Sequence, residues 1–137
     1  MVTSVRIICI CLMTLLGSSV FAEQKVDTLK VGDPSPEFRA TDKNGNEVTV
    51  KSLKGKYVYI DVWATWCEPC KMEIPFMKEL EKKFRGKKIA FVSISSEKNK
   101  GKWGEMVRIM EMTGIQINTG GDQSFMEAYR IAGIPWF

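Results

Sequence analysis

The most informative residues of this 137-residue chain are two cysteines separated by two residues, Cys67 and Cys70. They lie between an apolar run, residues 57–66, and an amphipathic run, residues 72–84, so we expect them where a strand passes into a helix. Two cysteines at this spacing can close a small disulfide and open it again. The pair therefore predicts thiol–disulfide exchange.

The residues between and beside the cysteines suggest how the two sulfurs differ. Pro69 suits the first position of a helix, because its missing N–H would have no partner there. The helix should therefore begin inside the motif, and its N-terminal dipole should favour the thiolate of Cys67. We expect Cys67 to be the nucleophile and Cys70 to attack the mixed disulfide and release the reduced substrate. The charge of Glu68 should disfavour the thiolate and shift the pair toward more reducing potentials.

Two carboxylates are candidates for proton transfer. Glu73 lies three residues after Cys70, and Asp61 lies in the middle of an apolar run. On a helix, Glu73 shares a face with an apolar stripe that should pack on the sheet: Phe76, Met77, Leu80 and Phe84. Burial should raise the pKa of Glu73, and two buried carboxylates should repel, so that one of them stays protonated at neutral pH. Either acid could exchange a proton with Cys70; the alternative is a structural role as a cap or a lysine partner.

The strands needed to position the cysteines are predicted by hydrophobic patterns. Residues 57–63 and 89–95 are apolar and partly β-branched, and the helical segment between them predicts a parallel βαβ unit. Residues 38–40 and 47–50 flank an Asn-Gly turn and predict a hairpin on the N-terminal side. The chain is therefore predicted to be a single α/β domain.

Two further helices are expected after the βαβ unit. Residues 102–113 place four apolar side chains on one helical face: Trp103, Met106, Val107 and Met110. Ser124 and Glu127 have the spacing of a capping box and should open a short helix that ends near Gly133.

Residues 1–22 have the pattern of a signal peptide. Arg6 precedes an uncharged apolar stretch, and small residues lead to Ala22, where we expect cleavage and export to the periplasm or another extracytoplasmic space. The alternative is an uncleaved signal that anchors the chain, although the uncharged stretch is slightly short for a spanning helix and stable membrane insertion is not expected. Cys9 and Cys11 should leave with the signal. Residues 23–137 then hold one cysteine pair, which indicates a reactive pair rather than a structural framework.

Composition and cysteine count exclude several other classes. The formal net charge is only +4, and the densest basic run, residues 82–88, is expected to be a solvated helix end, so no nucleic acid partner is expected. The chain has no histidine, and two cysteines are too few for a structural zinc site, so no metal is expected. A peroxidase would use a single cysteine in another sequence context. A copper site on Met106, Met110 and Met112 is weaker than core packing as an explanation of their spacing.

Residues 61–71, with the sequence DVWATWCEPCK, resemble the active-site signature of the thioredoxin superfamily. The extension KMEIP at residues 71–75 and the N-terminal hairpin are similar to the TlpA/ResA-type extracytoplasmic thiol–disulfide oxidoreductases. The resemblance covers about residues 31–137. It implies a thioredoxin-like three-layer fold, in which Cys67 attacks and Cys70 resolves. It also matches Glu73 to the acid of that branch and Asp61 to the buried aspartate of thioredoxins.

The resemblance also implies partners. These are protein disulfide or dithiol substrates, for instance apocytochrome cysteines before haem attachment, and a membrane electron donor of the thiol–disulfide type. No cofactor is implied, because the cysteines carry the electrons.

Residues 133–135 resemble the cis-proline loop of the superfamily, which lies against the cysteine pair and receives the substrate peptide. The resemblance thus implies a substrate-binding surface of Trp66, Ile134 and Pro135. Trp136 stands where the family usually has a smaller or charged residue.

In the superfamily two strands and a closing helix follow the cis-proline, whereas this sequence stops at Phe137. We therefore expect a fold that lacks these last elements, with an open edge on the strand before the cysteines and reduced stability. The alternative to an enzyme is a catalytically incompetent, truncated thioredoxin-like module that binds partners through Trp66, Ile134 and Trp136.

Overall fold

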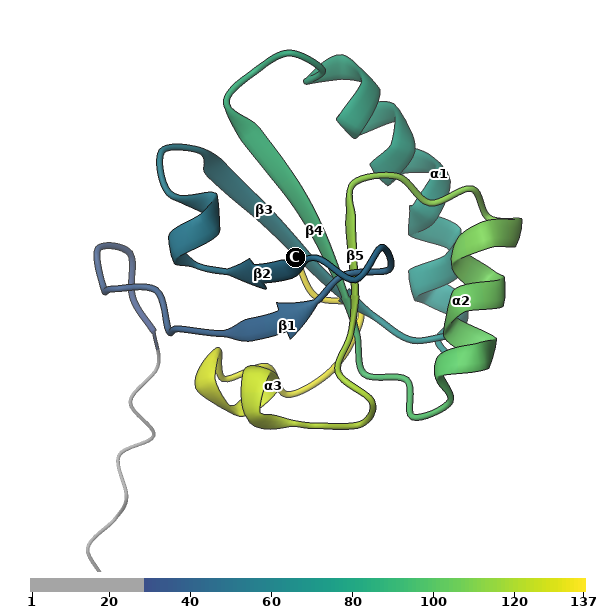
Figure 1. Ribbon diagram of the computed structural model, residues 1–137. Coiled ribbons are helices and arrows are strands. Elements are labelled where there is room, and N and C mark those ends of the chain that lie inside the picture. The colour runs from purple at the N-terminus through teal and green to yellow at the C-terminus, as the bar shows by residue number, and fades with distance from the viewer. Residues whose placement is uncertain (1–28) are drawn as a thin grey trace, which may run out of the picture.

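The computed structural model describes residues 29–137, so the expected signal peptide with Cys9, Cys11 and Ala22 lies outside the described residues. A parallel sheet of three strands, in the order β3-β4-β5, forms the centre of the fold (Figure 1). The strands are β3 (Tyr57–Trp63), β4 (Ile89–Ser95) and β5 (Ile115–Asn118). The predicted strands 57–63 and 89–95 are confirmed as parallel neighbours.

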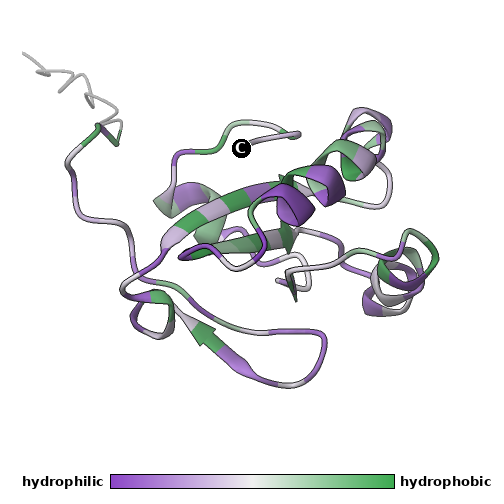
Figure 2. Cartoon of the chain, turned by 90° about the horizontal axis from the view of Figure 1, so that it is seen from above, coloured by the Kyte–Doolittle hydropathy of each residue, from purple (hydrophilic) through white to green (hydrophobic). Residues whose placement is uncertain are grey.

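Both faces of the sheet are covered, which gives three layers. Helices α1 (Glu68–Lys83) and α2 (Lys100–Ile109) lie on one side, and the hairpin of β1 (Arg39–Thr41) and β2 (Glu47–Thr49) lies on the other with the short helix α3 (Ser124–Ala128) (Figure 1). Hydrophobic bands dominate the strands of the sheet, with hydrophilic bands between them (Figure 2), as expected for a parallel sheet that is covered on both faces. The predicted hairpin is confirmed, with the bounds of its strands shifted by at most one residue.

The apolar core is divided by the sheet into two clusters. On the hairpin side, side chains of all three strands pack with those of the hairpin and α3: Val48, Val62, Val92, Ile94, Ile117 and Phe125. On the helix side, the core includes both cysteines and side chains of α1 and α2: Trp63, Cys67, Cys70, Ile74 and Val107. The cysteine pair is thus part of the packing between α1 and the sheet.

The segment after β4 differs from the predicted helix 102–113. Helix α2 begins after Asn99, whose side chain accepts a hydrogen bond from Lys102 N, and ends at Ile109. Strand β5 then follows at a place where the sequence analysis predicted no strand. Gly114 has φ 68°, and a Cβ there would lie 3.0 Å from the carbonyl oxygen of Phe91, so a glycine makes this sharp entry into β5 possible. The predicted apolar face of α2 is confirmed as part of the helix-side core.

Two predicted features of the other helices are wrong. The backbone N–H of Ser124 is bound by Asp122 Oδ1 at 2.8 Å, so no capping box forms between Ser124 and Glu127, and α3 ends at Ala128, well before Gly133.

In α1, Phe76 is 69% exposed and Phe84 38% exposed, so the predicted stripe does not pack on the sheet as a whole. Because Cys70 is buried at the first turn, the covered face follows from it at helical spacing and runs through Ile74 and Met77.

The outer edge of β3 is paired at a single position within the described residues. Val62 N donates to the carbonyl of Trp136 at 2.8 Å, while Tyr57 at the start of the strand is exposed.

No helix between residues 29 and 137 is long and apolar enough to cross a membrane.

Candidate active site

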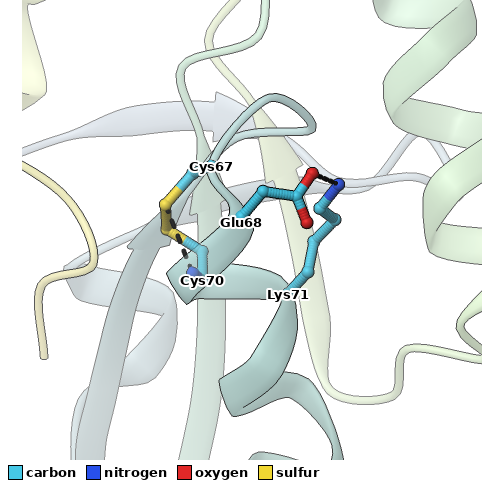
Figure 3. The surroundings of a disulfide bond; sticks show 4 residues. All are labelled: Cys67, Glu68, Cys70 and Lys71. Atoms are coloured by element: carbon cyan, nitrogen blue, oxygen red, sulfur yellow. Dashed lines mark hydrogen bonds and ion pairs between the residues drawn. A yellow bond between two sulfur atoms is a disulfide. The ribbon is translucent and has the colours of Figure 1, made fainter.

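Cys67 and Cys70 form a disulfide at the N-terminus of α1 (Figure 3). Cys67 is the N-cap residue, and its Sγ accepts a hydrogen bond from the backbone N–H of Cys70 at 3.3 Å. The helix starts at Glu68 with Pro69 in its first turn, so the prediction that the helix begins inside the motif is confirmed. Both cysteines are buried, at 5% and 3% exposure. What distinguishes the two sulfurs is therefore the amide at Cys67 rather than solvent access.

Glu68 forms an ion pair with Lys71, one turn further along α1 (Figure 3). The Lys71 side chain is the more covered partner, while Glu68 is largely exposed. The positive charge of the Lys71 ammonium group offsets the negative charge of the Glu68 carboxylate. Glu68 therefore disfavours the thiolate of Cys67 less than an isolated carboxylate would. The expectation from the sequence that Glu68 acts alone left out this partner, although the i,i+3 spacing of Glu68 and Lys71 indicates an ion pair.

Asp61 is buried in β3 and accepts a hydrogen bond of 2.6 Å from Ser93 Oγ. Burial raises the pKa of Asp61 to about 6; the bond from Ser93 opposes this shift, and the negative charge of Glu81 adds to it. From the sequence, repulsion between Asp61 and Glu73 is expected. In the structure, the carboxylate whose charge adds to the effect of burial on the pKa of Asp61 is that of Glu81.

A cavity of about 20 Å³ lies between α1 and the sheet, behind the disulfide. It brings together four of the residues singled out in the sequence: Asp61, Cys70, Glu73 and Pro135. Glu73 is half-buried there. A thiol at position 70 would thus share one small space with two carboxyl groups, an arrangement suited to proton transfer.

The loop before the C-terminal segment lies beside the cysteines. The Ile134–Pro135 peptide bond is cis, as expected from the sequence, and Ile134 packs against the cluster that holds both cysteines. Trp66 is 66% exposed next to Cys67. The Trp136 side chain packs on the hairpin-side core near Tyr129, and Ile134 contacts that core as well as the cysteine cluster.

Three residues of the site were missed in the sequence: Glu81, Ser93 and Gln116. All three line the cavity with Asp61. A hydroxyl residue in the apolar run 89–95 was a signal for Ser93. Gln116 had none, because β5 itself was not predicted.

A cysteine pair at the start of a helix that directly follows a strand of a parallel sheet, with a cis-proline segment beside it, defines a protein of thioredoxin-like fold. The comparisons with known proteins agree with this class. The Redoxin family model matches residues 30–134, and the chain belongs to this family.

The relatives include ResA proteins, which are thiol–disulfide oxidoreductases by name. ResA of Bacillus subtilis (strain 168) is 28% identical over 136 residues, covering 97% of this chain and 73% of the relative. ResA of Bacillus thuringiensis (strain Al Hakam) is 34% identical over 82 residues, covering 60% of this chain and 46% of the relative. The chain spans 46% to 64% of the length of the first curated relatives it matches. The predicted likeness to the TlpA/ResA branch is confirmed.

Solved structures show the same fold. A protein from Bacteroides vulgatus assigned as a thiol-disulfide oxidoreductase is 52% identical, with a TM-score of 0.67, and the match covers 80% of this chain and 72% of that one. The thioredoxin domain of another thiol-disulfide oxidoreductase from Bacteroides vulgatus is 26% identical, with a TM-score of 0.73 and 79% of each chain covered.

Proposed function

We propose that this protein is a thiol–disulfide oxidoreductase that reduces protein disulfides in an extracytoplasmic compartment through Cys67 and Cys70. The observation that carries the proposal is the disulfide at the N-cap of α1, where the Sγ of Cys67 receives the N–H of Cys70. An amide aimed at this sulfur stabilises negative charge on it after reduction. The names of the ResA relatives support the same activity.

The reaction consists of two exchanges. In the first, the thiolate of Cys67 attacks one sulfur of the substrate disulfide, a Cys67–substrate disulfide forms, and the other substrate sulfur leaves as a thiolate and takes a proton. In the second, Cys70 loses its proton and attacks the Sγ of Cys67. The mixed disulfide breaks, the second substrate thiol is released, and a Cys67–Cys70 disulfide forms. The cysteine pair has then given two electrons to the substrate. A dithiol donor at the membrane then reduces the pair again.

Asp61 and Glu73 are the bases for the second exchange. Both line the cavity that Cys70 lines. With its pKa raised to about 6, Asp61 is mostly ionised at neutral pH yet close enough to the ambient pH to take and return a proton. This balance makes Asp61 the stronger candidate of the two.

The surroundings of the cysteines suggest a peptide-binding surface. Trp66 is exposed next to Cys67, Ile134 packs against the cluster that holds both cysteines, and Pro135 lines the cavity with Cys70. We therefore assign substrate contacts to these three residues. We further propose that residues 1–22 direct export and are removed after Ala22, leaving residues 23–137 as the thioredoxin-like domain. We propose the cysteines of apocytochromes, before haem attachment, as one substrate of this activity.

The activity is tested by reduction of insulin disulfides with a dithiol as electron source, using wild type and the single variants Cys67→Ser and Cys70→Ser. Wild type should accelerate the reduction, Cys67→Ser should lose the acceleration, and Cys70→Ser should accumulate a mixed disulfide with the substrate. If wild type does no better than the dithiol alone, the oxidoreductase proposal is wrong. Retained binding of a partner by Cys67→Ser would then favour the noncatalytic module.

A further inference from the structure

A row of polar side chains crosses the sheet beneath α1. The strand register places Asp61 opposite Ser93, and Ser93 opposite Gln116. Residues in register on neighbouring strands point to the same face. All three are buried, Gln116 at 1% exposure. Apolar side chains are the rule where a parallel sheet is covered on both faces, so three buried polar ones in a row call for an explanation.

One atom of this row has no partner. Ser93 Oγ donates to Asp61 Oδ1, and Gln116 Nε2 donates to the carbonyl of Thr113. Gln116 Oε1 is buried and accepts no hydrogen bond from the protein. Such an acceptor is costly unless a water or a ligand satisfies it.

The free oxygen belongs to a residue that lines the cavity behind the disulfide, together with Asp61, Ser93 and Cys70. A volume of about 20 Å³ holds one water molecule. A water in this cavity can donate one hydrogen to Gln116 Oε1 and the other to the carboxylate of Asp61. Its lone pairs then remain free to accept the S–H of Cys70.

We propose that Gln116 is a positioning residue for proton transfer from Cys70 to Asp61, holding the water that bridges the thiol and the carboxylate. This inference rests on the proposed function. In the step, the S–H proton of Cys70 passes to the water, the water passes a proton to Asp61, and the electron pair of the S–H bond stays on sulfur. The thiolate of Cys70 then attacks the Sγ of Cys67, and Asp61 is left neutral.

Other charged and polar groups line the same cavity or lie near Asp61. Helix α1 contributes Glu73, Lys78 and Glu81 besides Cys70. Strand β5 and the C-terminal segment contribute Gln116, Pro135 and Phe137, whose side chains do not ionise. On β3 itself, burial raises the pKa of Tyr59, and the negative charges of Asp61 and Glu73 add to this rise. Glu81 is held by a hydrogen bond from Thr113. The negative charge of Glu81 favours a proton on Asp61, and the bond from Ser93 opposes it.

The test uses two substitutions in the row and one matched control. Gln116→Met removes the carboxamide and keeps an unbranched side chain of similar length, and Ser93→Ala removes the donor to Asp61. Ser95→Ala is the control, because Ser95 is buried on the same strand and face but is hydrogen-bonded to Glu97 N, outside the cavity. The titration of Asp61 is followed by NMR of ¹³C-labelled aspartate in the reduced full chain. The rate at which Cys70 resolves a mixed disulfide is measured beside it.

The titration midpoint of Asp61 should rise by about one pH unit in both Gln116→Met and Ser93→Ala. In Ser93→Ala the ionised carboxylate loses the hydrogen bond from Ser93, and in Gln116→Met the water that donates to the carboxylate loses its other acceptor. In Gln116→Met, resolution should slow about tenfold, less than for loss of a general base itself. Ser95→Ala should match wild type in both measurements.

A folded Gln116→Met chain with the wild-type midpoint and resolution rate would overturn the proposal. If this variant does not fold, Gln116→Glu keeps the shape and adds a charge to the cavity, so its Asp61 midpoint should rise and an unchanged midpoint overturns the proposal. The titration needs no turnover. An inactive wild type therefore contradicts the proposed function, while the midpoint of Asp61 still decides the role of Gln116.

Discussion

Ser93 Oγ donates a hydrogen bond of 2.6 Å to Asp61 Oδ1 across the β3–β4 pair. The two residues are directly in register, and both are buried under α1. This bond gives partial compensation to a carboxylate that burial alone would keep protonated, since hydrogen bonds to the charged form lower a pKa. The result is a carboxyl group that titrates near neutral pH within the cavity lined by Cys70.

The first prediction concerns stability against pH. Because the pKa of Asp61 is about 6 in the folded chain and about 3.9 when unfolded, the folded state binds more protons between these values. Stability should therefore fall as pH rises from 4 to 6, by about 3 kcal/mol from this group. Asp61→Asn should be more stable than wild type at pH 7, and the advantage should disappear below pH 4. Urea denaturation at the two pH values measures this, and an advantage that is the same at both would contradict the assigned pKa.

The second prediction concerns the ion pair beside Cys67. Lys71→Gln leaves Glu68 uncompensated and should make the disulfide more reducing, whereas Glu68→Gln should make it more oxidising. Since Glu68 is largely exposed, the shifts should be only about 5–20 mV. Equilibration with glutathione buffers measures the potential. The double variant should return toward wild type, and equal shifts in the same direction for both single variants would disprove the electrostatic explanation.

The third prediction concerns the reactivity of the two thiols. In the reduced chain, Cys67 should be alkylated faster than Cys70, with a midpoint in pH clearly below the value of about 8.5 for a free thiol. The physical reason is the N–H of Cys70, which is directed at the Sγ of Cys67. Alkylation rates across pH, with Cys67→Ser and Cys70→Ser to identify each thiol, provide the measurement. Two thiols that both react like free cysteine would mean that the reduced site is not assembled.

The fourth prediction compares two side chains on the faces of α1. Ile74 is buried against the sheet and Phe76 is 69% exposed. Ile74→Ala should cost about 2–5 kcal/mol of unfolding free energy through the lost packing, while Phe76→Ala should cost less than about 1 kcal/mol. Denaturant unfolding of both variants tests the pair. Equal losses would contradict the orientation of α1 in which Ile74 faces the sheet and Phe76 faces solvent.

Local patterns in the sequence were sufficient for much of the fold. The runs 57–63 and 89–95 carry enough apolar residues to identify two buried strands, and Pro69 marks the start of α1 because of its own covalent geometry. Strand β5 was missed because four residues are too few for a periodic pattern to identify a strand.

The sequence by itself determined the chemistry of this protein, since the spacing of Cys67 and Cys70 permits a disulfide wherever the motif begins a helix. The tertiary structure alone decided which groups surround that chemistry. Asp61, Ser93 and Gln116 come from three strands that are far apart in sequence, and the parallel register places them in one row. Glu81 joins them because Cys70 fixes which face of α1 is turned to the sheet. Periodicity specifies the type of an element, but the charges that share a buried cavity depend on long-range register and packing.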